Sequence, residues 1–156
     1  MKKKLIFGAI IAILLSSCGF KIVDNQKLYN YTITDISLKG DNKIAFILKN
    51  NLEVKNNLEK REKVKLNIEV KKNKFIKEKN IKNNIKKYEL SIVVNVKYNL
   101  DFSNKSGSFT VSKNGSYDVE EQYSKTINNE NNLIVSLSNS LVEEIKINIF
   151  EITSDL

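Results

Sequence analysis

The feature that most constrains the fold is a long run in which apolar and polar residues alternate. Every second residue from position 88 to position 100 is aliphatic or aromatic: Tyr88, Leu90, Ile92, Val94, Val96, Tyr98 and Leu100. Because successive side chains of a strand point to opposite faces, this spacing predicts one long strand with an apolar face. Val93 lies on the other face and indicates that the centre of the strand is covered on both sides.

A first strand is expected over 31–38, which is rich in β-branched and aromatic residues. Its apolar residues change face in the middle, because Tyr31 and Ile33 share one parity whereas Ile36 and Leu38 share the other. This shift of phase predicts a β-bulge, or a strand that begins late.

Two further strands flank the long one in the sequence. Residues 64–70 alternate strictly between apolar and polar side chains. Residues 109–119 hold one apolar parity after a turn at 104–107. Gly115 lies inside this last strand, where glycine predicts a kink or a bulge.

Two segments have the periodicity of a helix with one apolar stripe. In the first, Ile44, Leu48 and Leu52 are spaced by four, and Asp41 or Asn42 is available to cap the helix. The second is predicted over 133–150 from apolar residues that recur every three or four positions. Its apolar residues are Ile134, Leu137, Leu141, Ile145 and Ile149, and its expected cap is Asn128, Asn129 or Asn131.

The predicted order is therefore strand, helix, strand, strand, strand, helix. The last three strands have short connections and should form an antiparallel meander, whereas the helix between the first two suits a right-handed parallel crossover. Since each helix has a single apolar stripe, both should cover the same face of the sheet. The sequence predicts an α+β fold: a two-layer sandwich with a mixed four-stranded sheet, both helices on one face, and a single domain over 31–156.

The first thirty residues have a different character. Lysines at 2–4 precede an apolar run over 5–15 and the small residues Ser16 and Ser17, which is the layout of a secretory signal. The run is too short to cross a bilayer as a helix, which needs about 20 residues. We expect a signal peptide over 1–17, with cleavage before Cys18, and a tether over 18–30. The alternative is a thiol that merely ends an apolar segment.

The stretch around Cys18 resembles a bacterial lipobox. The resemblance implies a diacylglycerol on the thiol of Cys18 and a third acyl chain on its freed amine, and two or more chains give stable membrane anchoring. Gly19 stands where aspartate would favour retention in the inner membrane. By resemblance to lipoprotein sorting signals, the mature chain is expected at the outer membrane.

Composition excludes several classes of catalytic site. The chain has no histidine and Cys18 is its one cysteine, which removes Ser/His and Cys/His nucleophile systems and the usual zinc sites. The adjacent acidic pairs at 120–121 and 143–144 are expected to point apart and to be surface charge. We therefore expect no enzyme, no cofactor and no metal, although carboxylate, tyrosine or lysine chemistry stays open in principle.

Four stretches together resemble the lipopolysaccharide-assembly lipoproteins of the LptE family. They are Cys18-Gly19-Phe20-Lys21-Ile22, the strand over 88–100, the strand end Ser116-Tyr117-Asp118-Val119 and the closing helix over 133–150. The likeness spans the mature chain as an ordered pattern. It implies a structural subunit that sits inside an outer-membrane β-barrel of the LptD type, assists the assembly of that barrel, plugs it and contacts lipopolysaccharide.

Lysine is concentrated in the segment 71–87, which the alternation leaves as a loop between the second and third strands. Its eight lysines and one acid, Glu78, contribute +7, while the whole chain is +8 and the signal contributes +3 of that. The rest of the mature chain is thus net negative. The cluster should attract phosphate, loosely, because lysine acts as a point charge. Lys71 opens the run, and the candidate ligands of lipopolysaccharide are Lys72, Lys74, Lys77, Lys79, Lys82, Lys86 and Lys87.

Several alternatives stay open for this segment and for the chain. The apolar residues interleaved with the lysines, Phe75, Ile76, Ile81 and Ile85, are candidates for contact with acyl chains or a barrel wall. The segment is equally consistent with a solvated lysine-rich extension of a hairpin. In LptE-like proteins a second basic site precedes the last helix, where this chain has only Lys125. Nucleic acid is not expected as a partner, because export removes the chain from the cytoplasm. The alternative function is an accessory periplasmic lipoprotein of another lipid-transport system.

Overall fold

The computed structural model describes residues 31–52 and 62–154; Cys18, the predicted signal peptide and the predicted tether lie outside these ranges. Its elements are β1 (Tyr31–Gly40), α2 (Asn42–Leu52), β2 (Glu62–Lys79), β3 (Ile85–Leu100), β4 (Lys105–Asp118) and α3 (Tyr123–Ser154). The strands form one sheet in the order β1-β2-β3-β4. β1 is parallel to β2, and the other neighbours are antiparallel. The predicted α+β fold is confirmed.

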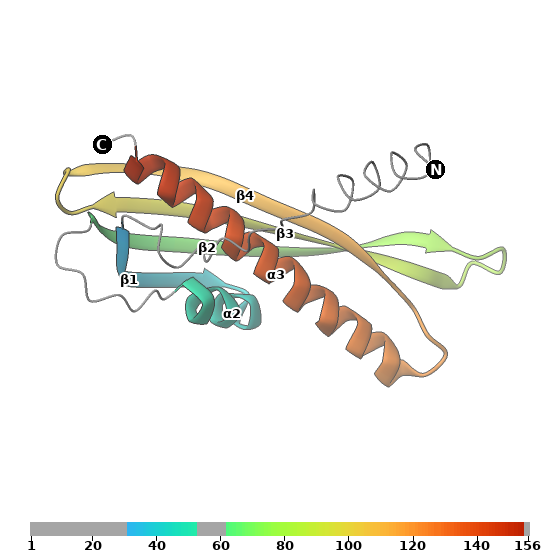
Figure 1. Cartoon of the computed structure of the whole chain (residues 1–156). Helices are drawn as coiled ribbons and strands as arrows, with labels where there is room; N and C mark the ends of the chain where they lie inside the picture. Colours follow the sequence, from blue (N-terminus) through green and yellow to red (C-terminus); the bar gives the residue numbers. More distant parts are fainter. Residues whose placement is uncertain (1–30, 53–61, 155–156) are drawn as a thin grey trace, which may run out of the picture.

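Both helices cover one face of the sheet, as predicted (Figure 1). The alternating positions of β2 and β3 and the stripes of the helices meet in one core. Its fully buried side chains include Val64, Leu90, Ile92, Val94 and Val96 from the sheet and Ile44, Leu48, Leu141 and Ile145 from the helices. α3 crosses the sheet diagonally, and α2 lies beside it.

The opposite face of the sheet carries no helix among the described elements. Val93 is partly exposed there, so the prediction that the centre of β3 is covered on both sides is wrong.

The change of phase in β1 is a bulge, as its sequence predicts. The register between β1 and β2 shifts between Ile33 and Asp35. After the shift Ile36 lies opposite Leu66, which returns the apolar residues of β1 to the face that the helices cover.

Of the two residues predicted to cap α2, Asp41 and Asn42, the structure has Asp41 as the cap. The backbone N–H of Ile44 donates a hydrogen bond to Asp41 Oδ1 over 3.1 Å, and the Asp41 carbonyl accepts from Ala45. The preceding residue, Gly40, has φ +107°, a conformation that glycine adopts without strain. A glycine followed by a capping aspartate therefore turns the chain from β1 into α2.

The segment 71–87 is not the loop that its sequence predicts. β2 continues to Lys79 and β3 already begins at Ile85, so only 80–84 form a turn. β1 ends opposite Val70, and β4 ends opposite Lys87. The hairpin over 71–87, which we call the arm, therefore projects beyond β1, and its end at 79–86 projects beyond β4 as well. Figure 1 shows it in green extending to the right. The sequence of this hairpin shows no alternation of apolar and polar residues, because polar side chains lie on both of its faces.

The last helix also begins earlier than predicted, at Tyr123 and not near 133. The asparagines expected to cap it lie inside its first turns, so that prediction is wrong. The start is fixed by Thr126, whose buried Oγ1 accepts a hydrogen bond from the Glu120 N–H over 2.9 Å. Gly115 causes no bulge either, because the register between β3 and β4 is unbroken. A Cβ at Gly115 would lie 2.8 Å from Leu133 Cδ1, so glycine here admits α3 close to the sheet.

Candidate functional site

The structure divides the lysines of 71–87 into two groups. Five of them form ion pairs with acids, and all five acids lie outside the segment. The pairs are Lys71–Glu69 (3.5 Å), Lys72–Asp41 (2.7 Å), Lys74–Glu130 (2.7 Å), Lys77–Glu89 (3.4 Å) and Lys87–Asp118 (3.3 Å). The charge counted within the segment therefore overstates what it offers to a ligand. Four of these pairs have no signal in the sequence, because their acids lie outside the strand that carries the lysine; only Glu69 shares a strand with its partner, Lys71.

One of these pairs is the centre of a small cluster between the arm and α3. Lys74 Nζ lies 2.7 Å from Glu130 Oε2, and the Tyr117 hydroxyl donates a hydrogen bond to the same oxygen over 2.6 Å. The ammonium also lies over the Tyr88 ring, 4.3 Å from its centroid, and 5.3 Å from that of Tyr117. We call these four residues, Lys74, Tyr88, Tyr117 and Glu130, the Lys74 cluster.

The ionisation of the Lys74 cluster follows from these contacts. Burial raises the pKa of Tyr117, and its hydrogen bond to Glu130 adds to this, so the pKa reaches about 12. Burial alone would raise the pKa of Glu130, but hydrogen bonds from Lys74 and Tyr117 outweigh it and hold that pKa below its usual value. Burial alone would lower the pKa of Lys74, but its polar contacts, chiefly the hydrogen bond to Glu130, outweigh burial and raise that pKa above its usual value. At neutral pH the cluster is an ion pair beside a neutral phenol.

The turn at the end of the arm is held by asparagine. Asn80 Oδ1 accepts hydrogen bonds from the backbone N–H groups of Lys82 (3.0 Å) and Asn84 (2.9 Å). Asn83 has φ +64°, a left-handed conformation that asparagine tolerates better than most residues. The turn therefore presents Ile81, whose side chain is fully exposed, in a defined position.

The remaining three lysines surround this turn. Lys79, Lys82 and Lys86 form no ion pair with any residue of the described ranges, although Lys79 Nζ donates a hydrogen bond to Asn83 Oδ1 over 3.0 Å. Phe75 and Ile76 are about half exposed on the strand that leads to the turn. We define the tip patch by these cations and apolar residues: Phe75, Ile76, Lys79, Ile81, Lys82 and Lys86. Glu78, which precedes Lys79 and is not counted in the patch, is the one acid within 75–86.

The tip patch combines the two properties that a phosphorylated, acylated molecule would meet. Unpaired ammonium groups attract phosphate, and exposed aliphatic and aromatic side chains contact hydrocarbon. Of the seven predicted ligand residues, the structure brings Lys79, Lys82 and Lys86 together at the tip and places the other four in ion pairs. Lys125 lies in the first turn of α3 and is exposed.

No helix of residues 31–52 or 62–154 is long and apolar enough to cross a membrane. Within the same ranges, no three or more Asp, Glu, His or Cys residues gather in a way that would hold a metal ion.

Comparison with known proteins finds similar structures and no similar sequence. No family profile matches the chain, and no curated protein matches it either. Rare lipoprotein B from Shewanella oneidensis superposes with a TM-score of 0.59 at 11% identity, over 78% of this chain and 98% of that one. A lipoprotein from Caulobacter crescentus gives 0.58 at 12% identity, over 82% and 93%. Uncharacterized lipoprotein B from Nitrosomonas europaea gives 0.58 at 17% identity, over 88% and 94%.

At these identities the likeness is one of fold. It covers nearly the whole length of all three solved lipoproteins. The chain therefore has the fold of these bacterial lipoproteins.

Proposed function

We propose that this chain is a lipid-anchored, non-enzymatic subunit of the lipopolysaccharide export machinery of the outer membrane, similar to LptE. The observation that carries the proposal is the combination of a lipobox-like Cys18 with the fold of solved lipoproteins over most of their length. Acylation of Cys18 would hold the periplasmic domain at the membrane through its tether. An outer-membrane β-barrel of the LptD type is the proposed partner.

The tip patch is the proposed contact with lipopolysaccharide. Lipopolysaccharide carries phosphate groups close to acyl chains. The end of the arm carries three lysines without an ion pair and the exposed Ile81, and the exposed Phe75 and Ile76 lie further along β2 on opposite faces of the strand. Lysine binds phosphate without the fixed geometry of arginine, which suits passing contact more than tight storage. The paired lysines nearer the sheet have a structural role in the same proposal, since they hold the arm against α2 and α3.

The tip can be tested with full-length protein in detergent, using lipopolysaccharide as the probe and fluorescence as the measurement. Replacing Lys79, Lys82 and Lys86 by Gln should weaken binding at low salt, and the loss should shrink as salt rises, because exposed charges are screened over about 8–10 Å at ordinary ionic strength. The matched control replaces three exposed lysines on α2 and at the other end of the sheet, Lys49, Lys63 and Lys105. Equal affinity of both triple variants at low salt would contradict the role of the tip.

The partner is tested separately, by purifying the full chain from membranes and identifying what co-purifies with it. A large outer-membrane β-barrel protein is the expected result. The alternative, an accessory lipoprotein of another lipid-transport system, predicts components of a different transporter and no such barrel. Replacement of Cys18 by Ser should release the chain from membranes of cells that lack the barrel. Retention of that variant after a salt wash would contradict anchoring by lipid.

A further inference from the structure

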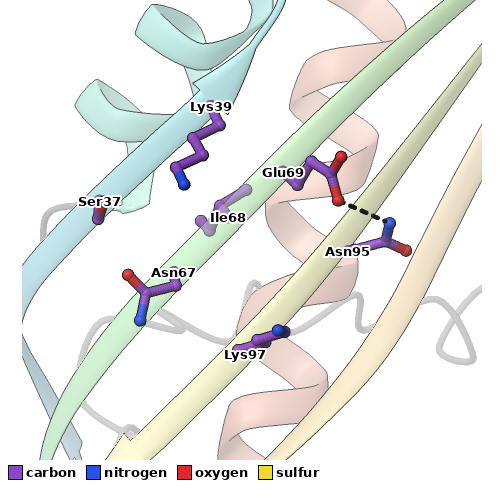
Figure 2. Close-up of a pocket in the computed structure, with 7 residues that line it drawn as sticks. All are labelled: Ser37, Lys39, Asn67, Ile68, Glu69, Asn95 and Lys97. Carbon is purple, nitrogen blue, oxygen red and sulfur yellow. Dashed lines mark hydrogen bonds between the residues drawn. The ribbon is translucent and has the colours of Figure 1, made fainter.

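The face of the sheet that carries no helix has a shallow polar hollow of about 430 Å³ over β1, β2 and β3. Figure 2 shows its lining side chains in front of the strands, with α3 passing behind the sheet. The lining residues are Ser37, Lys39, Asn67, Ile68, Glu69, Asn95 and Lys97. The Ile68 side chain is buried on the opposite face, so this residue contributes backbone to the floor. The hollow is separate from the tip patch.

The strand register arranges the six polar residues as a grid of two rows. In one row Ser37 lies opposite Asn67, which lies opposite Lys97; in the other, Lys39 lies opposite Glu69, which lies opposite Asn95. Asn67 therefore occupies the middle of the first row, and the two lysines stand at diagonal corners. Since neighbouring strands are about 4.8 Å apart and residues along a strand about 3.3 Å apart, the backbones at these corners are about 12 Å apart.

The charged residues of the grid differ in whether their charge has a partner in the protein. Glu69 is matched by Lys71 at 3.5 Å and accepts a hydrogen bond from Asn95 Nδ2, also at 3.5 Å. Asn95 is oriented in turn by Thr110, whose hydroxyl donates to Asn95 Oδ1 over 2.9 Å. Lys39 and Lys97 form no hydrogen bond or ion pair through their ammonium groups with any residue of the described ranges. The hollow therefore has positive charge at two diagonal corners, Ser37 and Asn95 at the other two, and Asn67 and Glu69 in the middle.

We propose that this hollow binds an acidic saccharide of about two sugar units, with its anionic groups toward Lys39 and Lys97. Asn67, Asn95, Ser37 and Glu69 offer both donors and acceptors to sugar hydroxyls. The lining has no aromatic side chain on which a nucleobase would stack, and the side chain of Ile68, its one aliphatic residue, is buried on the other face. A single inorganic anion is too small to reach both corners. The proposal does not depend on the function proposed above.

The test is a titration of the full chain in detergent at low salt, using digalacturonate as the probe. Binding is followed by NMR through the side-chain amide signals of Asn67 and Asn95, with lactose and inorganic phosphate as comparison ligands. Digalacturonate should shift both signals at millimolar concentration, lactose should shift them much less, and added salt should weaken the binding.

The two lysines are then tested against a charge-matched control. Replacing both Lys39 and Lys97 by Gln should weaken digalacturonate about fivefold or more, since each exposed ionic contact contributes only modestly. Replacing both Lys49 and Lys105 by Gln changes the net charge equally and should leave the affinity as it is. Absence of binding, equal binding of lactose, or equal loss in both double variants would overturn the proposal. Phosphate binding as tightly as digalacturonate would mean an adventitious ion only, and would overturn it too.

Discussion

Replacement of Glu130 by Gln is the sharpest test of how the arm is held. The carboxylate accepts hydrogen bonds from Lys74 and from Tyr117, and its side chain is only 17% exposed. Glutamine keeps the shape and one oxygen, and both hydrogen bonds go to a single oxygen of Glu130, so the change removes mainly the charge. A hydrogen bond to a charged group contributes about 1.5–3 kcal/mol when it is sheltered from water. Lys74 is 38% exposed, so solvent screens its share, and we expect a total loss of about 1–2 kcal/mol.

The assay is urea unfolding of wild type, Glu130→Gln, Lys74→Met and the double variant. Methionine keeps most of the apolar stem of lysine above the Tyr88 ring while it removes the ammonium. If the pair acts as described, the double variant should be more stable than additivity predicts, with a coupling of about 1 kcal/mol. The control is Glu143→Gln, which removes a 3.3 Å pair with Lys146 from a side chain that is 57% exposed. That change should stay within about 0.5 kcal/mol.

Two results would refute the reasoning. Effects of Glu130→Gln and Lys74→Met that add within about 0.5 kcal/mol would mean that the two side chains do not act as a pair. A loss for Glu130→Gln no larger than that for Glu143→Gln would mean that burial gives the Lys74 cluster no special strength. Either outcome would mean that the Lys74–Glu130 pair does not hold the arm and would leave that role to backbone pairing and the other ion pairs.

The remaining predictions concern the core, the turn into α2 and the pH dependence. Leu141→Ala should lower the free energy of unfolding by about 2–5 kcal/mol, because this side chain is fully buried; an unchanged melting temperature would place the apolar stripe of α3 elsewhere. Gly40→Ala should cost more than about 1 kcal/mol, because φ is positive and the new Cβ would overlap the Val70 carbonyl oxygen, and circular dichroism during heating measures it. The lowered pKa of Glu130 stabilises the fold above the usual glutamate pKa, and that stability is lost as pH falls, so Glu130→Gln should flatten the acid side of the stability profile. The raised pKa of Tyr117, about 12, makes wild-type stability fall as pH rises from the usual tyrosine value of 10.0 toward 12, and Tyr117→Phe should flatten that decline.

Most of the fold could be predicted because it depends on local patterns of burial. The alternation in β3 and the stripe of α3 mark side chains that must leave water, and the buried residues of the structure are those side chains. The phase shift in β1 was visible for the same reason, since a bulge moves an apolar residue to the other face. The Asp41 cap was visible because it acts within four residues.

The arm and the first turns of α3 could not be predicted, because distant polar contacts hold them in place. Lys74 and Glu130 are 56 positions apart, and neither lies in a segment with apolar periodicity. A polar strand whose side chains bond to other elements looks like a loop in the sequence. The helix start at Tyr123 was hidden in the same way, since residues 123–132 are mostly polar and show no apolar stripe.

The same contacts change what the lysine count means for function. A net charge concentrated in one segment suggests a broad basic surface, yet the acids that balance it come from β2, β3, β4, α3 and the residue before α2. Once those pairs form, lysines without an ion pair among the described residues include those of the tip patch and of the open face of the sheet. The paired lysines near the sheet fix the direction of the arm, and the unpaired ones at its end are free for a ligand. Charge at the tip can therefore be removed without loosening the fold, whereas charge at Lys74 cannot, and this difference allows binding and stability to be tested separately.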